Sequence, residues 1–313
     1  MPRAVPVLLG LLAAAAPSCY DRRAGVHPLD FVTAGTGQDR PASGPSSRPA
    51  SGPASRPTSR PAQGEGDHAD GSVSSRPAAA PGEDGIPATD GLAKVLAAAV
   101  AGDTVDYAAV ARHRAELDAY LRAVAGARLD EADKKERLAF WINAYNAAVL
   151  DKVLRTVIGK GKDGGDRFGV LEVPEFFDEV GFEVAGRRLS LNQIEEAARA
   201  LGDPRVHFAV NCASVSCPAL RAEPWTAETL HPDLDRATRA YFASPQGLVV
   251  DGDEVRVTKL LEWYAKDFAD VGGPAAFLLR YAPEGTREAI RKHGITGHLE
   301  YDWALNRTRG AGR

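Results

Sequence analysis

The sequence predicts an α+β (mixed α/β) fold: a single helix-rich domain with a small sheet of short strands, preceded by a disordered tail. Residues 133–157 place apolar side chains three and four positions apart, which is typical of an amphipathic helix. Residues 182–189 and 248–257 each hold two short strand-like runs around a turn, which predicts β-hairpins. Residues 19–90 are rich in Ser, Arg, Pro, Ala and Gly and contain few apolar side chains to bury.

The first residues are typical of a secretory leader. One positive charge at Arg3 precedes an apolar run over residues 7–16, which is too short to span a bilayer. Small residues then precede Cys19 and resemble a bacterial lipobox, so we expect residues 1–18 to be a lipoprotein-type signal peptide and Cys19 to be lipidated. The alternative is an ordinary cleaved signal with Cys19 incidental, which would make the protein secreted.

The next segment, residues 19–90, is predicted to be a disordered spacer. Its composition cannot offset the entropy of ordering, and its prolines favour an extended chain. The tripeptide Ser-Arg-Pro recurs in it, which leaves open a ligand for a partner or the cell wall; the repeats begin at Ser47, Ser55, Ser59 and Ser75. The globular domain is expected over residues 91–305, and residues 306–313 are expected to be a flexible C-terminus.

Charge and composition narrow the class of partner. The formal net charge is −4 and the basic residues are scattered, so nothing favours a nucleic-acid partner. No cofactor signature is recognised. We expect a lipid-anchored protein of the cell envelope, facing the periplasm or the exterior, whose partners are the membrane and an unidentified envelope ligand or protein.

The elements of the domain follow from periodicity and capping residues. Ser190 or Asn192 can cap the helix that starts at residue 191. A short strand is expected over residues 206–210, where apolar and other residues alternate. Asp302 and Trp303 are expected to fold back as the last element. Helices are predicted at residues 92–100, 109–124, 133–157, 191–201, from Thr226 onward, 259–268 and 275–281.

The candidate site is the loop that follows the predicted strand. His207 lies in the strand, and Cys212 and Cys217 lie in a loop of small polar residues that begins at Asn211. Proteins with α/β folds place their sites at such strand ends. In a cysteine hydrolase either thiol would be the nucleophile, and a bend at Asn211 would be needed to bring His207 to it. The group that orients the histidine would be Asn143, Asn146 or Asp267.

Other interpretations of the thiols stay open. In an oxidising compartment the pair Cys212 and Cys217 favours a disulfide that braces a short loop. Alternatively, the two cysteines are simply small residues buried in the fold. A zinc site with His207 and His231 lacks a second closely spaced ligand pair, so no metal is predicted.

A binding site is predicted from the remaining polar and aromatic side chains. Asn143 and Asn146 lie one turn apart on an apolar helix, where they either hold loop backbone or face a ligand. Glu195 is expected to lie inward beside His207. The aromatic residues near Asp267 either pack or form the wall of a ligand cleft. The candidate binding residues are Asn143, Asn146, Glu195, Asn211, Ser216, Trp263, Tyr264 and Asp267.

Five blocks of sequence together resemble the domain of unknown function 547, over residues 92–277. They are Val-Asp-Tyr at 105–107, Phe-Trp-Ile-Asn-Ala-Tyr-Asn at 140–146, Ile-Glu at 194–195, residues 203–218, and Lys-Leu-Leu-Glu-Trp-Tyr-Ala-Lys-Asp-Phe at 259–268. The resemblance implies a bacterial envelope lipoprotein and supports the predicted fold. It implies no activity, because the biochemical activity of the family is unsettled.

Two features limit what the resemblance implies for chemistry. Bacterial members carry histidine where this chain has Glu196, and plant members resemble the loop with serines in place of the cysteines. We therefore expect first a membrane-tethered envelope module that binds a peptide, glycan or protein. The alternative is a cysteine-dependent hydrolase or transferase that uses Cys212 or Cys217.

Overall fold

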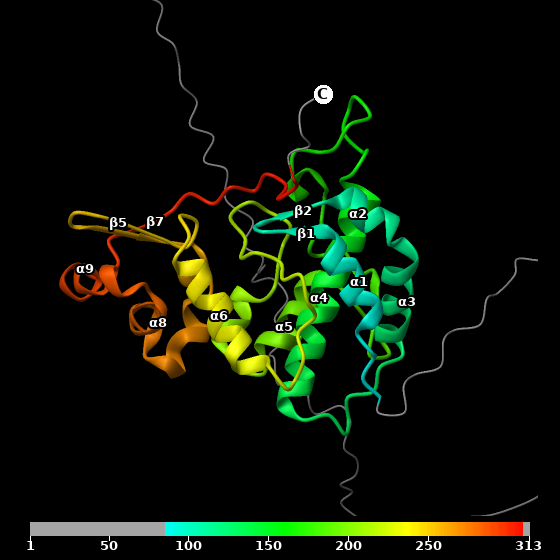
Figure 1. The fold of residues 1–313 in the computed structure, drawn as a ribbon, viewed down its shortest axis with the longest axis horizontal. Coiled ribbons are helices and arrows are strands. Elements are labelled where there is room, and N and C mark those ends of the chain that lie inside the picture. Colours follow the sequence, from blue (N-terminus) through cyan, green and yellow to red (C-terminus); the bar gives the residue numbers. More distant parts are fainter. Residues whose placement is uncertain (1–84, 309–313) are drawn as a thin grey trace, which may run out of the picture. The chain divides into compact units, whose positions relative to one another are not determined.

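The computed structural model describes residues 85–308 (Figure 1). The predicted signal peptide, Cys19 and nearly all of the predicted spacer lie outside these residues. Over the described part of the chain, no helix combines the length and the apolar character that crossing a membrane requires.

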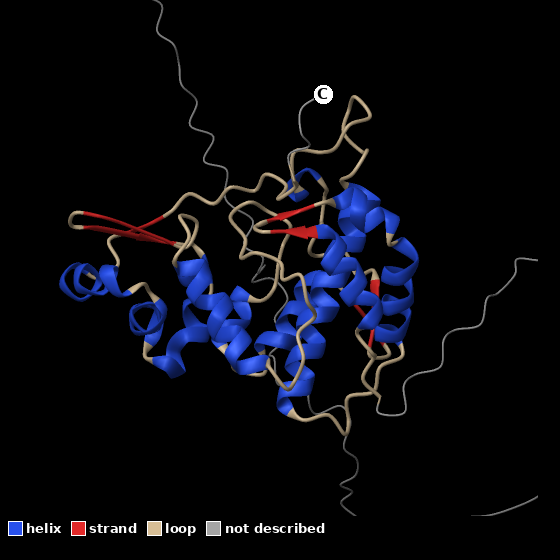
Figure 2. Ribbon diagram, in the orientation of Figure 1, coloured by secondary structure: helices blue, strands red, loops and turns tan. Residues whose placement is uncertain are grey.

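The fold is helix-rich with small sheets, as the sequence predicts (Figure 2). The α-helices are α1 Asp90–Ala99, α2 Tyr107–Arg112, α3 Arg114–Ala125, α4 Lys134–Thr156, α5 Leu191–Arg199, α6 Leu230–Phe242, α7 Leu260–Trp263, α8 Gly273–Tyr281 and α9 Arg287–His293. The 3₁₀ helices are η2 Val170–Glu172, η3 Pro204–Phe208, η4 Ala265–Val271 and η5 Glu284–Thr286. The strands are β1 Val100–Ala101, β2 Thr104–Val105, β3 Phe182–Val184, β4 Arg187–Leu189, β5 Leu248–Asp251, β6 Glu254–Val257 and β7 Gly297–His298.

Helix α4 is the central element and confirms the strongest helical prediction. It begins with a capping box in which Asp133 and Glu136 each bind the other's backbone N–H, so two unpaired donors of the first turn are satisfied. From Leu138 to Val153 every residue is buried. A helix that is buried all round must satisfy its polar side chains inside the protein, which determines the roles of Asn143 and Asn146 below.

Two apolar clusters form the core. The first surrounds α4 and includes side chains of α1, α2, α3 and α5. The second lies among α6, α8 and the β5–β6 hairpin, where Phe208, Phe242 and Phe277 pack against one another. Phe208 belongs to η3, so the segment that carries His207 lies where the two clusters meet.

The sheets are short and confirm both predicted hairpins. Strands β3 and β4 are antiparallel, with Phe182 opposite Leu189, and the turn at Gly186 has a φ of 71°. Strands β5 and β6 are antiparallel, and β7 pairs with β6 in parallel. The capping of α5 by Ser190, in a box with Gln193, is also confirmed.

The C-terminal segment folds back across the domain, as predicted for Asp302 and Trp303. It leaves β7, passes the loop that carries Cys212 and Cys217, and reaches β2 (Figure 1). Backbone hydrogen bonds join Val215 to Ala304 and Val105 to Asn306. Asn306, which falls in the predicted C-terminal tail, is 3% exposed.

Four element predictions need correction. Residues 206–210 are not a strand: Asp203 accepts the Arg205 N–H and Pro204 opens a 3₁₀ helix, which overrides the alternating pattern. The predicted helix 109–124 is two helices that meet at His113, and 259–268 changes from α7 to η4 at Tyr264. Helix α6 begins at Leu230 rather than near Thr226, because Asn143 holds the preceding backbone at Trp225.

Candidate functional site

The thiol loop, residues 209–218, is held by an amide from α4. Asn146 donates to the Ala209 carbonyl at 3.0 Å and accepts the Asn211 N–H at 2.9 Å. Asn143 makes the same paired contact with the backbone of Trp225, at 2.8 and 2.9 Å. Both amide side chains are buried and have both ends occupied, so they hold loop backbone, which is one of the two roles that the sequence left open.

Asn211 fixes the shape of the loop from within. Its amide donates to the Pro218 carbonyl at 2.7 Å, and its oxygen accepts the Ala213 N–H at 3.0 Å. The same oxygen accepts from Asn306 of the C-terminal segment at 3.2 Å. Between the two cysteines, the buried Ala213 has a φ of 66°, which a residue with a side chain rarely adopts. The loop therefore holds its strained turn through these hydrogen bonds.

The two cysteines are free thiols in contact, so the predicted disulfide is not formed here. The Cys212 N–H donates to the Cys217 sulfur at 2.9 Å. The Cys212 sulfur lies 3.0 Å from the Ser214 hydroxyl and 3.3 Å from that of Tyr301. A thiol surrounded by such donors is stabilised as its anion.

The surroundings separate the pKa values of the two thiols. Burial opposes ionisation of Cys212, but hydrogen bonds from Cys217, Ser214 and Tyr301 outweigh it and lower its pKa from 9.0 to about 7. Burial and the neighbouring Cys212 raise the pKa of Cys217 well above its ordinary value. Ionisation of the pair is therefore favoured at Cys212 over Cys217.

His207 is held by a carboxylate and two aromatic rings. Its Nε2 lies 2.9 Å from Asp267, its ring stacks on Tyr264 at 4.1 Å, and its side chain is buried. Asp267 also accepts from Arg199 at 2.8 Å. Although burial opposes it, hydrogen bonds from His207 and Arg199 hold the pKa of Asp267 well below its usual range.

A narrow cleft of about 20 Å³ brings most predicted site residues together. Cys212, Cys217, His207 and Glu195 line it, and Glu195 is 5% exposed. The expected inward position of Glu195 beside His207 is therefore confirmed. Aromatic side chains close the cleft, in the set Tyr145, Trp263, Tyr264, Tyr301 and Trp303.

Part of this lining is an aromatic wall, the half-buried Trp263, Tyr301 and Trp303. Trp263 stacks on Trp303 at 6.1 Å and contacts Tyr301 at 5.0 Å. Of the aromatic pair expected to pack or to form a wall, Trp263 lies here beside two residues of the C-terminal segment, and Tyr264 stacks on His207.

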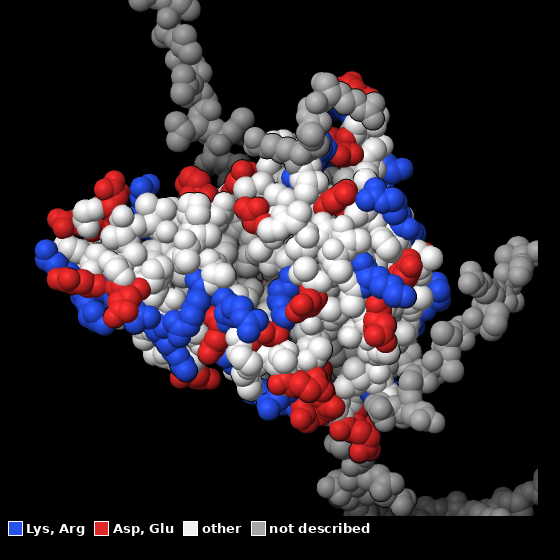
Figure 3. Space-filling view, viewed as in Figure 1, with Lys and Arg blue, Asp and Glu red and all other residues white. Residues whose placement is uncertain are grey.

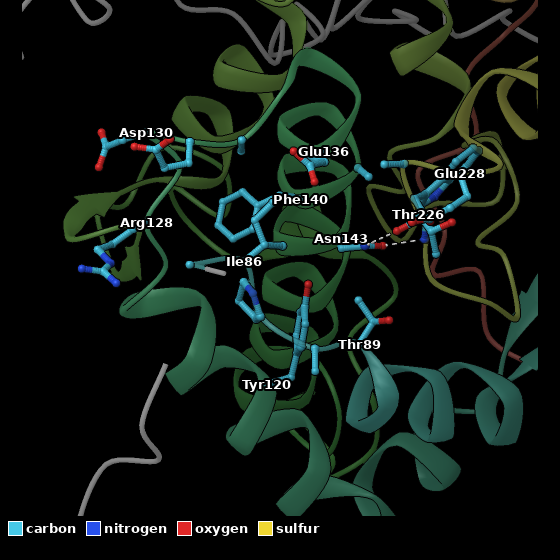
Figure 4. A pocket seen from close by; sticks show the side chains of 18 residues that line it. Ile86, Thr89, Tyr120, Arg128, Asp130, Glu136, Phe140, Asn143, Thr226 and Glu228 are labelled. Carbon is cyan, nitrogen blue, oxygen red and sulfur yellow. Dashed lines mark hydrogen bonds between the residues drawn. The ribbon is translucent and has the colours of Figure 1, made fainter. Parts of the chain in front are cut away.

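The remaining candidates lie beside the cleft or away from it. Asn211 and Ser216 form the loop, and the Ser216 hydroxyl accepts the Asp302 N–H at 2.8 Å. Asn143 instead lines the larger cavity of about 790 Å³ shown in Figure 4, with Tyr120, Phe140 and Glu228. The dashed lines in Figure 4 show that its amide is engaged with backbone there.

Four contributors to the site were not predicted: Arg199, Ser214, Tyr301 and Trp303. Arg199 lies one turn after Glu195, so its position on the same face of α5 was a usable signal. Ser214 lies within the loop motif itself. Tyr301 and Trp303 carry no periodic signal, because their role depends on where the C-terminal segment returns.

Figure 3 shows acidic and basic side chains interspersed on one face of the protein. Over residues 85–308, no three His, Cys, Asp or Glu side chains are grouped as metal ligands. His231, the candidate fourth zinc ligand, lies 2.9 Å from Arg205 instead.

Comparison with known proteins finds a family match for part of the chain and indicates no activity. Residues 129–242 match the family described as "Protein of unknown function, DUF547". No curated protein and no solved structure matches the chain. The matched segment contains α4, α5, the thiol loop and α6. The chain therefore carries a DUF547 domain at residues 129–242.

Proposed function

We propose that this protein is a cysteine-dependent hydrolase or transferase in which Cys212 is the nucleophile. One observation carries the proposal: a thiol with hydroxyl donors at 3.0 and 3.3 Å shares a cleft with a histidine that a carboxylate holds. Nucleophilic cysteines need an environment that favours the thiolate, and catalytic histidines need a group that orients the ring. Ser214 and Tyr301 meet the first requirement at Cys212, and Asp267 meets the second at His207.

The step that these groups support is acyl transfer. The Cys212 sulfur attacks the carbonyl carbon of an ester, thioester or amide, and the C–O, C–S or C–N bond to the leaving group breaks. His207 bonds Asp267 through Nε2, so its Nδ1 is the atom that would take the Cys212 proton and then give it to the leaving group. Water or a second acceptor then releases the acyl group from sulfur as an acid or a transfer product.

The size of the cleft constrains the substrate. A volume of about 20 Å³ holds a reacting carbonyl group and little more. The rest of the substrate must lie outside, near the half-buried Trp263 and Trp303. We therefore expect small acyl groups to react faster than bulky ones.

The test uses p-nitrophenyl acetate as a small acyl donor. The purified full-length chain should release nitrophenol in a burst and carry an acetyl group on tryptic peptide 206–221, which holds both Cys212 and Cys217. Fragmentation should place the acetyl group on Cys212. Cys212→Ser should lose the burst, and acetylation confined to Cys217 or absent from the peptide would contradict the proposal.

A second candidate function, a binding module, rests on the aromatic wall. Stacked Trp263 and Trp303 are typical of surfaces that bind sugar rings or extended peptides. The ligand would be an envelope peptide, glycan or protein. Soluble peptidoglycan fragments added to the full-length chain should quench tryptophan fluorescence saturably, and Trp303→Ala should abolish that change. An unchanged response in Trp303→Ala would remove the support for this function.

We also propose that the protein is exported and anchored to the cell envelope through Cys19. The support is the lipobox-like sequence before Cys19 and the composition of residues 19–90. Metabolic labelling with a palmitate analogue should mark the wild-type chain and not Cys19→Ser. Equal labelling of both chains, or none of either, would contradict the anchor.

A further inference from the structure

The two thiols differ in their access as well as in their charge. Cys212 is 8% exposed and lines the narrow cleft. Cys217 lines that cleft and also a second cavity of about 350 Å³ beside α6, with Phe208, Leu220 and Tyr241. Cys217 therefore lies between the two cavities, and its sulfur contacts the Cys212 N–H at 2.9 Å.

We propose that Cys212 and Cys217 are a reversible dithiol–disulfide pair that is oxidised by hydrogen peroxide through the narrow cleft and reduced by a thiol through the cavity beside α6. This activity needs the arrangement of the two sulfurs and the two cavities. It goes beyond acyl transfer and does not depend on it.

The volume of the cleft selects the oxidant. A space of about 20 Å³ admits one molecule about as large as water, and hydrogen peroxide is close to that size. A protein disulfide or a glutathione disulfide is far larger than this space. Small-molecule oxidation at Cys212 is therefore favoured over exchange with a large disulfide.

The chemistry balances within the site. The Cys212 thiolate attacks one peroxide oxygen, the O–O bond breaks, and hydroxide leaves to give a sulfenic acid; a proton from solvent converts the hydroxide to water. The Cys217 sulfur then attacks the Cys212 sulfur, the S–O bond breaks, and the Cys217 proton leaves with the hydroxyl as water. Two thiols and one peroxide give one disulfide and two waters.

Reduction reverses the process from the other side. A reducing thiol in the cavity beside α6 meets the Cys217 sulfur and attacks it, so the S–S bond breaks and Cys212 leaves as its thiolate. A second reducing thiol releases Cys217 and takes the oxidising equivalents as a new disulfide. Cys212 is the better leaving group because Ser214 and Tyr301 hydrogen-bond its sulfur.

The test follows the thiols directly in the full-length chain carrying Cys19→Ser, so that Cys212 and Cys217 are its only cysteines. Reduced protein is treated with hydrogen peroxide near pH 7 and digested with trypsin. We expect peptide 206–221 to lose two hydrogens as both thiols disappear together, and dithiothreitol to restore them. Independent loss of the two thiols, or no reaction at peroxide concentrations that oxidise free cysteine, would overturn the proposal.

Two single variants give the matched comparison. Cys217→Ser should accumulate a sulfenic acid on Cys212 that dimedone traps, because the resolving thiol is gone. In Cys212→Ser, Cys217 should be oxidised at least about tenfold more slowly than Cys212 is in Cys217→Ser, because the Cys217 thiol is not favoured as an anion. Equal rates in the two variants would overturn the proposal, provided that both unfold at the temperature of the parent chain.

The outcome is separable from acyl transfer. Peroxide linkage without acetylation of Cys212 by p-nitrophenyl acetate would support the redox pair and contradict the proposed function. Acetylation of Cys212 without a disulfide after peroxide treatment would support the proposed function and contradict the redox pair.

Discussion

The DUF547-matched segment, residues 129–242, and the residues that follow it, 243–308, contribute to the cleft in different ways. The matched segment supplies the groups that can react, Cys212, Cys217 and His207. The following residues supply Asp267, which holds His207, and Tyr301, which hydrogen-bonds the Cys212 sulfur. The reactive groups therefore come from the matched segment, and the groups that tune them come from both parts of the chain.

The difference has a structural cause. The C-terminal segment lies along the thiol loop, with backbone hydrogen bonds at Val215 and Ser216 and a side-chain bond from Asn306 to Asn211. Those contacts bring Tyr301 to the Cys212 sulfur. The segment before it, η4, brings Asp267 to η3. A chain truncated at residue 242 would keep the thiols and Ser214 but lose the Tyr301 hydroxyl and the carboxylate partner of the histidine.

The largest effect is expected at the nucleophile itself. Cys212→Ser should lower acetyl transfer from p-nitrophenyl acetate by about 10³-fold or more, because a serine hydroxyl in this cleft is not ionised near neutral pH. The measurement is the amplitude and rate of the nitrophenol burst. An unchanged burst in a variant of unaltered melting temperature would contradict Cys212 as the nucleophile.

The next effect tests the contribution of residues after 242 to the base. Asp267→Asn should lower the same rate roughly 10²-fold, because His207 loses the carboxylate that orients it. The matched control is Asp235→Asn, which removes a carboxylate bonded to Arg205 and Tyr281 instead. Equal losses in the two variants would show that charge near η3, rather than the contact with His207, matters.

Asp267 also predicts a dependence of stability on pH. Its pKa is lowered in the fold, so its interactions stabilise the protein above the ordinary value of 3.8 and are lost as the pH falls below it. The stability difference between wild type and Asp267→Asn should therefore be constant near neutral pH and shrink in acid. Denaturant unfolding over that range measures it, and a difference that grew in acid would contradict the assignment.

A smaller effect is expected on stability within the matched segment. Asn146→Ala should lower the free energy of unfolding by about 3 kcal/mol, because the Ala209 carbonyl and the Asn211 N–H lose their partner in a buried setting. Asn192→Ala is the control, since Asn192 bonds Asp178 in an exposed setting and should cost less than about 1 kcal/mol. Similar losses would mean that the amide of α4 does not hold the loop.

The smallest effect is expected on the pKa of Cys212, and it tests the role of the C-terminal segment. Tyr301→Phe removes one hydroxyl donor and should raise the pKa of Cys212 by up to about one unit. Tyr281→Phe, which removes a hydroxyl bonded to Asp235, should leave that pKa unchanged. The pH dependence of iodoacetamide reaction at Cys212 measures both. Equal pKa values in all three proteins would remove Tyr301 from the site.

Sequence patterns predicted the parts of the fold that depend on near neighbours. Apolar spacing indicated α4, and turn chemistry indicated the β3–β4 and β5–β6 hairpins. The pattern failed at residues 206–210, where alternating apolar residues competed with an Asp-Pro pair that caps a 3₁₀ helix. In such a short segment the local backbone preference outweighed the two-residue period.

Only part of the candidate site could be predicted from sequence patterns. Cys212, Cys217 and His207 lie close together in the sequence, so their grouping was predictable. The pairing of His207 with Asp267 was one of several options, because residues 60 apart meet only through tertiary packing. The return of Tyr301 to Cys212, across 89 positions, has no local signal at all.

The central claim is that Cys212 is an activated thiol, and its ionisation tests this most directly. The rate of iodoacetamide reaction at Cys212, read on tryptic peptide 206–221 of the full-length chain, should rise with pH through a midpoint of about 7. A midpoint near the ordinary value of 9.0, or above it, would contradict an activated nucleophile in this cleft.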